Sequence, residues 1–149
     1  MTDADLIEDV QRAAGADRPP DERAARTAEL IRTRTGRRRV GIYRVTDNEV
    51  RNIAWSGPEA PAYPNLSIEQ GLTGTAIRSR NTVLSNDVAN DSRYLTNQQS
   101  TGSELIVPVL LGETVVGTLD IEDPATNAFD KNDQALFEDL ATALTALYS

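Results

Sequence analysis

Apolar residues near the start of the chain recur at the spacing of an α-helix. Leu6, Val10 and Ala14 lie four positions apart, which places them on one face of a helix. A second apolar stripe runs through residues 22–35, with Asp21 in a position to cap that helix. Both stripes are narrow, so we expect these helices to contact other helices. For the N- and C-terminal helices, a four-helix bundle shared by two copies of the chain is preferred over packing within one copy.

Further along, apolar and polar positions alternate with the period of two that is typical of strands. Residues 40–45 and 50–55 alternate in this way around a polar turn, and residues 82–85 predict a short strand. The clearest pattern covers residues 103–123, where two alternating segments meet at Gly112. The sequence therefore predicts two hairpins with a short strand between them.

Two further helices complete the pattern. Residues 71–80 predict a short helix, and Phe137 and Leu140 mark one face of a C-terminal helix. Asp130 and Asp133 stand at its N-cap and N3 positions, a variant of the capping box. This order of elements predicts an α+β fold in which N- and C-terminal helices flank a central antiparallel sheet of five to six strands.

The length of 149 residues predicts a single domain. We expect residues 1–20 to form a helical extension and residues 21–149 to form the core. The N-terminus lacks the basic and apolar pattern of a signal peptide, and no stretch has the roughly 20 apolar residues of a membrane helix. These features predict a cytoplasmic protein that does not bind membranes.

Composition excludes several kinds of chemistry. The chain has no Cys and no His, which excludes disulfides, thiol nucleophiles, Ser-His-Asp catalysis and metal sites built on those residues. We therefore expect no catalytic residues, metal or cofactor. The net charge of −8 disfavours nucleic acid as a partner. The basic cluster at residues 37–39 is interpreted as a solvated turn before a strand.

Acidic residues gather at one end of the hairpin at residues 103–123. Asp120 and Glu122 lie two positions apart, so their side chains share one face of a strand. Antiparallel pairing brings Glu104 to the same end. Converging carboxylates raise each other's pKa and attract a cation. The alternative, which the sequence leaves open and favours for Glu122, is that this end of the sheet is solvated.

Other polar and aromatic residues are candidates to accompany the acids. Tyr43, Trp55 and Tyr94 are suited to cover an apolar or cationic ligand, although packing in the core or an interface is the favoured explanation for Tyr43 and Trp55. Asp87 and Tyr94 flank the polar segment 86–102, whose length is typical of functional loops. Asp87 is equally suited to capping a turn.

Several short motifs occur together in one order. They are GLTGTA at 71–76, VLSNDV at 83–88, SELIVPV at 103–109 and NAF at 127–129. In their order and spacing they resemble a GAF domain over residues 22–148. The resemblance implies a small sensor whose ligand pocket lies between the sheet and residues 86–102. It also implies terminal helices that commonly pair across a dimer.

Within that family, the motifs are most similar to the free methionine-(R)-sulfoxide reductases. Those enzymes use cysteines, and alignment of the motifs puts Tyr63, Thr73 and Asn97 at the cysteine positions. None of these residues can form a sulfenic acid or a disulfide, so we expect the reductase chemistry to be absent. The resemblance also implies that acids at the positions of Glu104, Asp120 and Glu122 hold the ammonium group of an amino-acid ligand.

The sequence thus predicts a non-catalytic sensor or regulatory domain. It would bind a small molecule, such as an amino acid or another amine, and signal to a separate protein through a homodimer of its terminal helices. The predicted ligand-binding residues are Glu104, Asp120, Glu122, Tyr94, Asp87, Trp55, Tyr43 and Ser103. The alternatives are a divergent reductase-like protein and a structural dimerisation module without a ligand.

Overall fold

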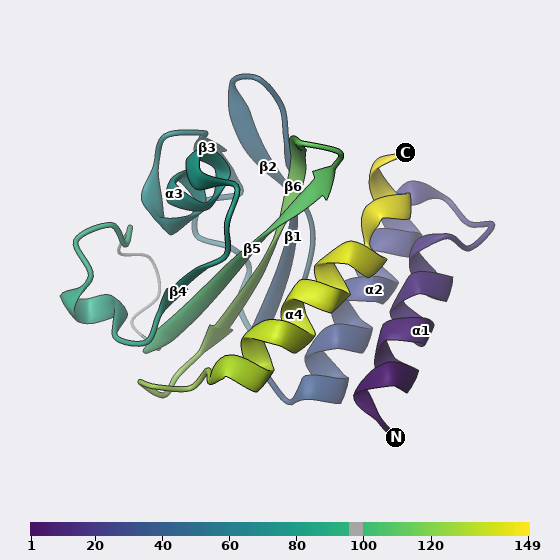
Figure 1. Cartoon of the computed structure of the whole chain (residues 1–149), viewed down its shortest axis with the longest axis horizontal. Helices are drawn as coiled ribbons and strands as arrows, with labels where there is room; N and C mark the ends of the chain where they lie inside the picture. The colour runs from purple at the N-terminus through teal and green to yellow at the C-terminus, as the bar shows by residue number, and fades with distance from the viewer. Residues whose placement is uncertain (96–99) are drawn as a thin grey trace.

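One antiparallel sheet organises the chain, in a computed structural model that describes residues 1–95 and 100–149 (Figure 1). Its strands are β1 (Arg39–Val45), β2 (Glu49–Ser56), β3 (Asn65–Ser67), β4 (Val83–Ser85), β5 (Ser103–Leu111) and β6 (Thr114–Asp123). They lie in the order β3-β2-β1-β6-β5-β4. The predicted α+β class and antiparallel sheet are confirmed, and β3 is a strand that the sequence pattern did not predict.

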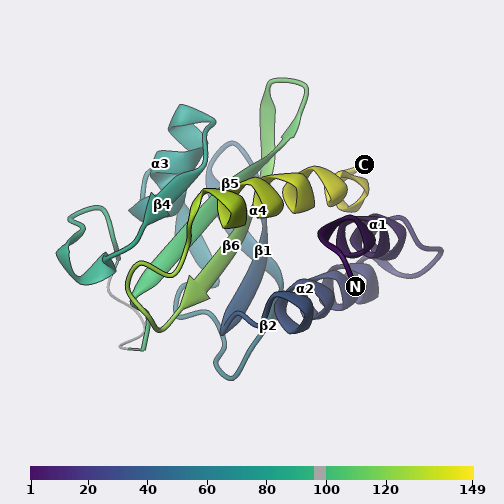
Figure 2. The ribbon, with the colours of Figure 1, turned by 60° about the horizontal axis from the view of Figure 1, so that its bottom comes forward.

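The helices cover the sheet unequally. They are α1 (Asp3–Ala14), α2 (Pro20–Thr35), α3 (Gly71–Ser79) and α4 (Lys131–Ala143), with short 3-10 turns η1 (Val88–Asn90) and η2 (Thr145–Tyr148). Helices α1, α2 and α4 lie together on one side, whereas α3 lies on the opposite side beside β4 (Figures 1 and 2). The sheet therefore has a helix side and an α3 side. Within the described residues, no helix is both long and apolar enough to cross a bilayer.

Strand register decides which residues face each side. In the β5–β6 hairpin, Glu104 pairs with Glu122 and Ile106 with Asp120. On the other edge of β6, Arg39 of β1 pairs with the same Glu122. Because directly paired residues in neighbouring strands point to the same face, these charged side chains gather on the α3 side. Their sequence neighbours point to the helix side.

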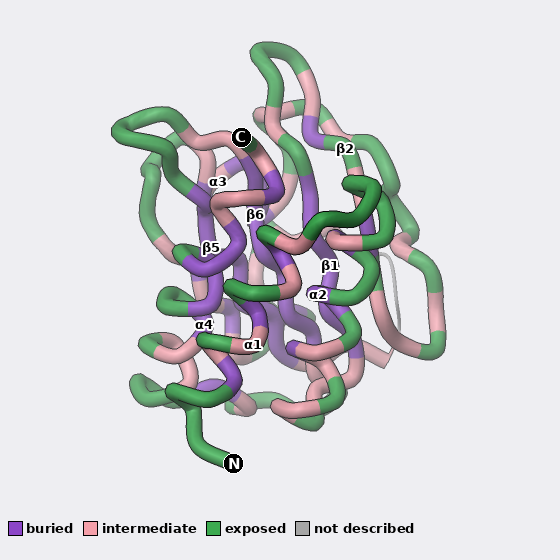
Figure 3. Tube along the Cα trace, turned by 90° about the vertical axis from the view of Figure 1, so that its right-hand side faces the viewer, coloured by how far each residue is buried: buried purple, intermediate pink, exposed green. Residues whose placement is uncertain are grey.

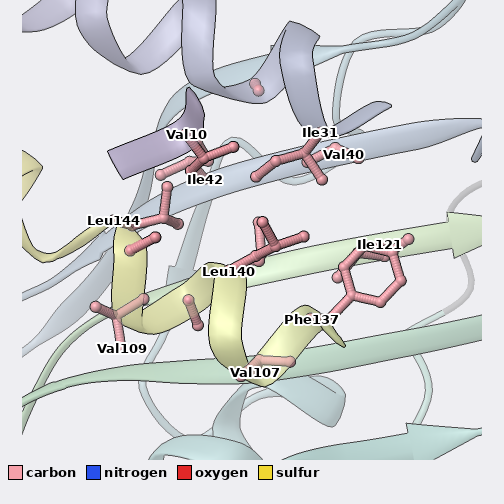
Figure 4. Packing of buried hydrophobic residues seen from close by; sticks show 14 of the residues in the cluster. Val10, Ile31, Val40, Ile42, Val107, Val109, Ile121, Phe137, Leu140 and Leu144 are labelled. Atoms are coloured by element: carbon pink, nitrogen blue, oxygen red, sulfur yellow. The ribbon is translucent and has the colours of Figure 1, made fainter. Parts of the chain in front are cut away.

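The helix side holds the main apolar core. Its largest fully buried members come from the central strands and from all three covering helices (Figures 3 and 4). They are Val10, Ile31, Val40, Ile42, Leu105, Leu119, Ile121, Phe137, Leu140 and Leu144. At roughly 1.5–3 kcal/mol for each buried side chain, this core dominates the stability of the fold.

The N-terminal helix contributes to this core within one chain. Leu6, Val10 and Ala14 are all buried and belong to the same apolar cluster as α4. The reason given for a second copy of the chain, that this stripe is too narrow for a core position, is therefore wrong. The homodimer itself stays a prediction. Helix α1 packs against both α2 and α4, and α2 contributes small buried residues such as Ala24 and Ala28 to the same cluster.

Capping explains where α4 begins. Asp130 accepts a hydrogen bond from the Asp133 amide at 2.8 Å, and Asp133 accepts one from the Asp130 amide at 2.9 Å. The predicted capping box of α4 is thus confirmed. The predicted cap at Asp21 is wrong, because α2 already begins at Pro20. Asp21 lies instead in the first turn, where an acid favours the helix dipole.

The basic cluster at residues 37–39 is paired with acids rather than solvated, which corrects the interpretation of a solvated turn: Arg39 is buried, and Arg37 and Arg38 are half-buried. Arg37 forms salt bridges with Asp123 at 3.1 Å and Asp133 at 3.2 Å. Its guanidinium carbon lies 4.4 Å from the centre of the Phe129 ring, a cation–π contact. Arg37 therefore ties the start of β1 to the NAF segment and the first turn of α4.

Candidate functional site

Three carboxylates are buried on the α3 side of the sheet. Only 8% of Glu104, 9% of Asp120 and 6% of Glu122 is exposed to solvent. The alternative of a solvated sheet end is therefore wrong for all three. Lys, Glu, Arg and Asp are almost never this buried unless they are paired, so the partners of each carboxylate decide its role.

Glu122 is fully paired. Arg39, which is itself buried, forms a salt bridge with it, and the Thr101 hydroxyl donates a hydrogen bond to it at 2.7 Å. Arg39 also donates to the carbonyl oxygen of Ala60 at 3.1 Å. A buried carboxylate with these partners is already neutralised. Glu122 therefore serves the fold, by joining β6 to β1.

Glu104 and Asp120 lack such partners. The Oε2 atom of Glu104 and the Oδ1 atom of Asp120 are buried, and neither accepts a hydrogen bond from a described residue. The other oxygen of Asp120, Oδ2, accepts a long hydrogen bond from the Thr73 hydroxyl, at 3.5 Å. An unsatisfied buried carboxylate oxygen is costly, and two of them on one face indicate a site that is incomplete without a donor.

The pKa values of these two groups reflect that environment. The pKa of Glu104 is raised to about 8, mainly by burial and next by the nearby Asp120 carboxyl. Arg39 lowers this pKa, but by less than Asp120 raises it. Burial raises the pKa of Asp120 to about 7, against the lowering influence of the Thr118 hydroxyl, Arg39 and the Thr73 hydroxyl. At neutral pH the pair therefore holds at least one proton, which a bound cation would displace.

A small cavity of about 40 Å³ lies against these carboxylates. Residues from β1, α3, the loop before β3 and the segment after η1 line it. They are Tyr43, Pro61, Ala62, Tyr63, Leu66, Gly71, Leu72, Thr73, Tyr94, Leu95, Glu104 and Asp120. A volume of this size holds a few water molecules at most. The cavity as it stands accommodates a head group rather than a whole metabolite.

Four of the predicted site residues line this cavity. Besides Glu104 and Asp120, they are Tyr43 and Tyr94. Burial, with Asp120 nearby, strongly raises the pKa of the Tyr43 hydroxyl, and burial together with Glu104 raises the pKa of Tyr94 to about 12. Both tyrosines therefore stay neutral at physiological pH.

Three other predicted residues lie outside the cavity lining. Trp55 on β2 is 39% exposed. Asp87 is exposed and accepts a hydrogen bond from the Asn90 side chain at 2.7 Å, which fits the turn-capping explanation. The Ser103 hydroxyl donates to the Ala125 carbonyl oxygen at 2.7 Å and so fixes the segment after β6. Their predicted contact with a ligand remains a prediction.

Sequence reasoning missed the contribution of Gly41. A methyl group added there would lie 2.9 Å from the Cε1 atom of Tyr43, so only glycine allows the Tyr43 ring to lie over this position. Arg39 was missed as well, although it lies two positions before Gly41 and hence on the same face. Thr73 and Tyr63 were considered only as replacements for cysteines. A third such position, Asn97, lies outside the described residues.

The geometry can now be compared with known proteins. The family model described as "GAF domain" matches residues 19–146. The chain belongs to the GAF domain family. Among curated proteins, it is 28% identical over 96 residues to GAF domain-containing protein A of Dictyostelium discoideum, an alignment that covers 64% of this chain and 60% of that relative. The alignment thus spans less than two thirds of the relative's length.

Solved GAF-like structures show the same fold. The free methionine-R-sulfoxide reductase of Neisseria meningitidis, solved with its substrate, superposes with a TM-score of 0.87 at 22% identity, covering 98% of this chain and 87% of that one. A putative GAF sensor protein of Burkholderia vietnamiensis superposes with a TM-score of 0.86 at 24% identity, covering 95% of this chain and 90% of that one. A reductase and a sensor share this fold, so the chemistry of the present GAF domain has to be argued from its own cavity.

Proposed function

We propose that this GAF domain is a non-catalytic sensor or regulatory domain that binds a small molecule carrying a protonated amine, such as an amino acid or another amine. The observation that carries the proposal is the pair Glu104 and Asp120, each with a buried oxygen that has no hydrogen-bond partner within residues 1–95 and 100–149. A ligand ammonium supplies both the positive charge and the N–H donors that these atoms lack.

An organic cation is favoured over a metal ion. Within the described residues, no group of three or more acidic, His or Cys side chains is placed to hold a metal. Three tyrosines also border the cavity, and aromatic rings suit an organic cation better than a hard metal ion, which prefers oxygen ligands.

Residue chemistry supports a non-catalytic role. The chain has no Cys, and the cavity instead presents Thr73 and Tyr63, two of the residues aligned with cysteines of the reductases. A hydroxyl cannot pass through the sulfenic acid and disulfide states that a thiol visits. We therefore expect no turnover of free methionine-R-sulfoxide, and consumption of this compound by the purified protein would contradict the non-catalytic role.

A thermal-shift screen tests the binding role. The purified protein is heated with amines, amino acids and their sulfoxides at about pH 8.5, above the pKa of Glu104, which is about 8. A ligand at about 100 times its Kd stabilises the fold by about 2.7 kcal/mol. We expect a stabilising amine whose effect disappears in Asp120→Asn and persists in Asp139→Asn, a control at an exposed position on α4. An effect that survives Asp120→Asn would contradict the site.

The second candidate function is a structural module without a ligand, and the small cavity volume favours it. Tyrosine and leucine side chains already fill most of the space above the carboxylates. Binding of anything larger than an ammonium head group would require Tyr63 or Tyr94 to move. If no amine stabilises the protein, the scaffold role replaces the sensor role.

We further propose a homodimer as the signalling assembly, formed by the outer faces of α1 and α2. A hollow of about 550 Å³ between these helices is lined by five arginines, including Arg18 and Arg26, whereas the first half of α1 carries Asp3, Asp5 and Glu8. Antiparallel pairing of two copies would bring the acidic end of one onto the basic end of the other.

Charge pairing of this kind weakens as salt screens it. We expect light scattering to give a dimer at low salt, with dissociation favoured at high salt or by Arg26→Glu. A monomer at every protein concentration and salt concentration would contradict the homodimer.

A further inference from the structure

The lining of the cavity also indicates which kind of amine fits. We propose that the ligand is an amine without a carboxylate beside its ammonium group, in contrast to an α-amino acid. This inference rests on the proposed amine site and narrows its ligand class.

Charge in the cavity is the first reason. The twelve lining residues include Glu104 and Asp120 and no Lys, Arg or His. Arg39, which acts electrostatically on both carboxyls, lies outside the lining and is already bonded to Glu122 and to the carbonyl oxygen of Ala60. The carboxylate of an α-amino acid would therefore enter an anionic cavity without a cationic side chain to pair with.

Backbone N–H groups at the start of α3 are the other possible partner for a ligand carboxylate. That turn is already next to an anion, because the Thr73 hydroxyl donates to Asp120 at 3.5 Å. A ligand carboxylate placed there would lie close to the Asp120 carboxylate, and two like charges in a buried site repel strongly. The start of α3 therefore has Asp120 as its neighbouring anion, and a ligand carboxylate is disfavoured there.

Aromatic enclosure is the third reason. Three of the four tyrosines in the chain, Tyr43, Tyr63 and Tyr94, line this one cavity. Tyrosine rings attract ammonium groups and the alkyl carbons next to them. Tyr63 is 38% exposed, so an outward movement of its ring would open a route to solvent for an alkyl chain. The cavity of about 40 Å³ then holds the ammonium head alone.

Calorimetry with three matched ligands tests this inference on the intact protein. Isoamylamine and leucine share the same branched chain and differ by the carboxylate. In ε-aminocaproate the carboxylate is far from the ammonium, and its net charge equals that of leucine. At about pH 8.5 we expect isoamylamine to bind at least about ten-fold more tightly than leucine, a difference of about 1.4 kcal/mol. We expect ε-aminocaproate to bind closer to isoamylamine than to leucine.

The outcomes separate this inference from the function on which it rests. Leucine binding as tightly as isoamylamine would overturn the inference. If leucine binding is then lost in Asp120→Asn and kept in Asp139→Asn, the amine site itself still stands. Absence of binding by all three ligands to the wild-type protein would contradict both proposals. Binding of isoamylamine that is unchanged in Asp120→Asn would place the amine elsewhere and overturn both as well.

Discussion

Strands β1, β5 and β6 bury opposite chemistry on their two faces. On the helix side, Val40, Leu105 and Ile121 pack against α2 and α4 in a continuous apolar core. On the α3 side, the next residues along the same strands include Glu104 and Asp120, which are also buried but have one oxygen each without a hydrogen-bond partner among the described residues. The first face is complete within the chain, whereas the second is not.

The difference is the basis for proposing a ligand site on the α3 side. Apolar side chains satisfy one another, so a foreign molecule on the helix side would only disrupt packing. A buried carboxylate without a cationic partner lowers the stability of the fold. Binding of a cation on the α3 side would therefore recover that loss of stability. Such incompletely satisfied positions cluster at functional sites.

Breaking the buried ion pair should have the largest effect. In Arg39→Met, Glu122 keeps its charge in a buried site without its cationic partner. We expect the free energy of unfolding to fall by about 3–5 kcal/mol, as measured by urea denaturation. The double variant Arg39→Met/Glu122→Leu should recover most of the loss. A double variant as unstable as the single one would contradict the role of Arg39 as partner of Glu122.

A truncation on the helix side should cost slightly less and should not depend on pH. Leu140→Ala removes a fully buried side chain from the core (Figure 4), at a cost of about 3 kcal/mol. Denaturation at several pH values should show the same loss at each. Leu110→Ala, at a half-exposed position on the hairpin tip, is the control and should change stability by no more than about 0.5 kcal/mol. A loss that varies with pH would mean that the two faces are coupled.

The α3 side should make stability depend on pH. Glu104 and Asp120 have folded-state pKa values of about 8 and about 7, above their ordinary values, so the folded protein binds more protons than the unfolded chain between about pH 4 and pH 8. The free energy of unfolding should therefore fall as pH rises through this range and level off above it.

Denaturation across this range measures the slope, which should shrink in Glu104→Gln. The pKa of Asp91 is lowered by its hydrogen bonds with Arg93. Asp91 therefore changes the stability only below about pH 4 and does not contribute to the slope between pH 4 and pH 8. A wild-type stability that rises between pH 4 and pH 8 would contradict the placement of the carboxyls.

Neutralising one carboxylate should have the smallest effect and the opposite sign. Asp120→Asn removes a buried charge while keeping the shape of the side chain, so we expect the ligand-free protein to be stabilised by about 1 kcal/mol at about pH 8.5. Thermal or urea denaturation measures the change. Asp139→Asn should be neutral, since it lies on an exposed surface. Destabilisation by Asp120→Asn would mean that the carboxylate already has a partner in the folded state.

Local sequence signals predicted most of the fold. The capping box at Asp130 and Asp133 and the alternation through residues 103–123 each depend on neighbours within a few positions, which a sequence pattern records directly. The short strand β3 was missed because its pairing with β2 is all that defines it. Asp21 was placed wrongly because proline begins the helix one residue earlier.

The carboxylate pair of the candidate site was predicted because one hairpin contains both residues. Glu104 and Asp120 lie on adjacent strands joined by a short turn, so their convergence follows from antiparallel pairing. The partner of Glu122 could not be found in this way, because Arg39 lies on a strand more than 80 positions earlier in the sequence and reaches it through sheet order. Ser103 was included because it precedes Glu104, although successive residues on a strand face opposite sides.

The central claim is that Glu104 and Asp120 form a cation site that is incomplete in the free protein. The most direct test is a carboxyl carbon NMR titration of both residues, without a ligand and with saturating isoamylamine. The account predicts pKa values of about 8 and about 7 in the free protein, and a clear fall of both when the amine is bound. Ordinary carboxyl pKa values in the free protein, or raised values that the amine leaves unchanged, would contradict it.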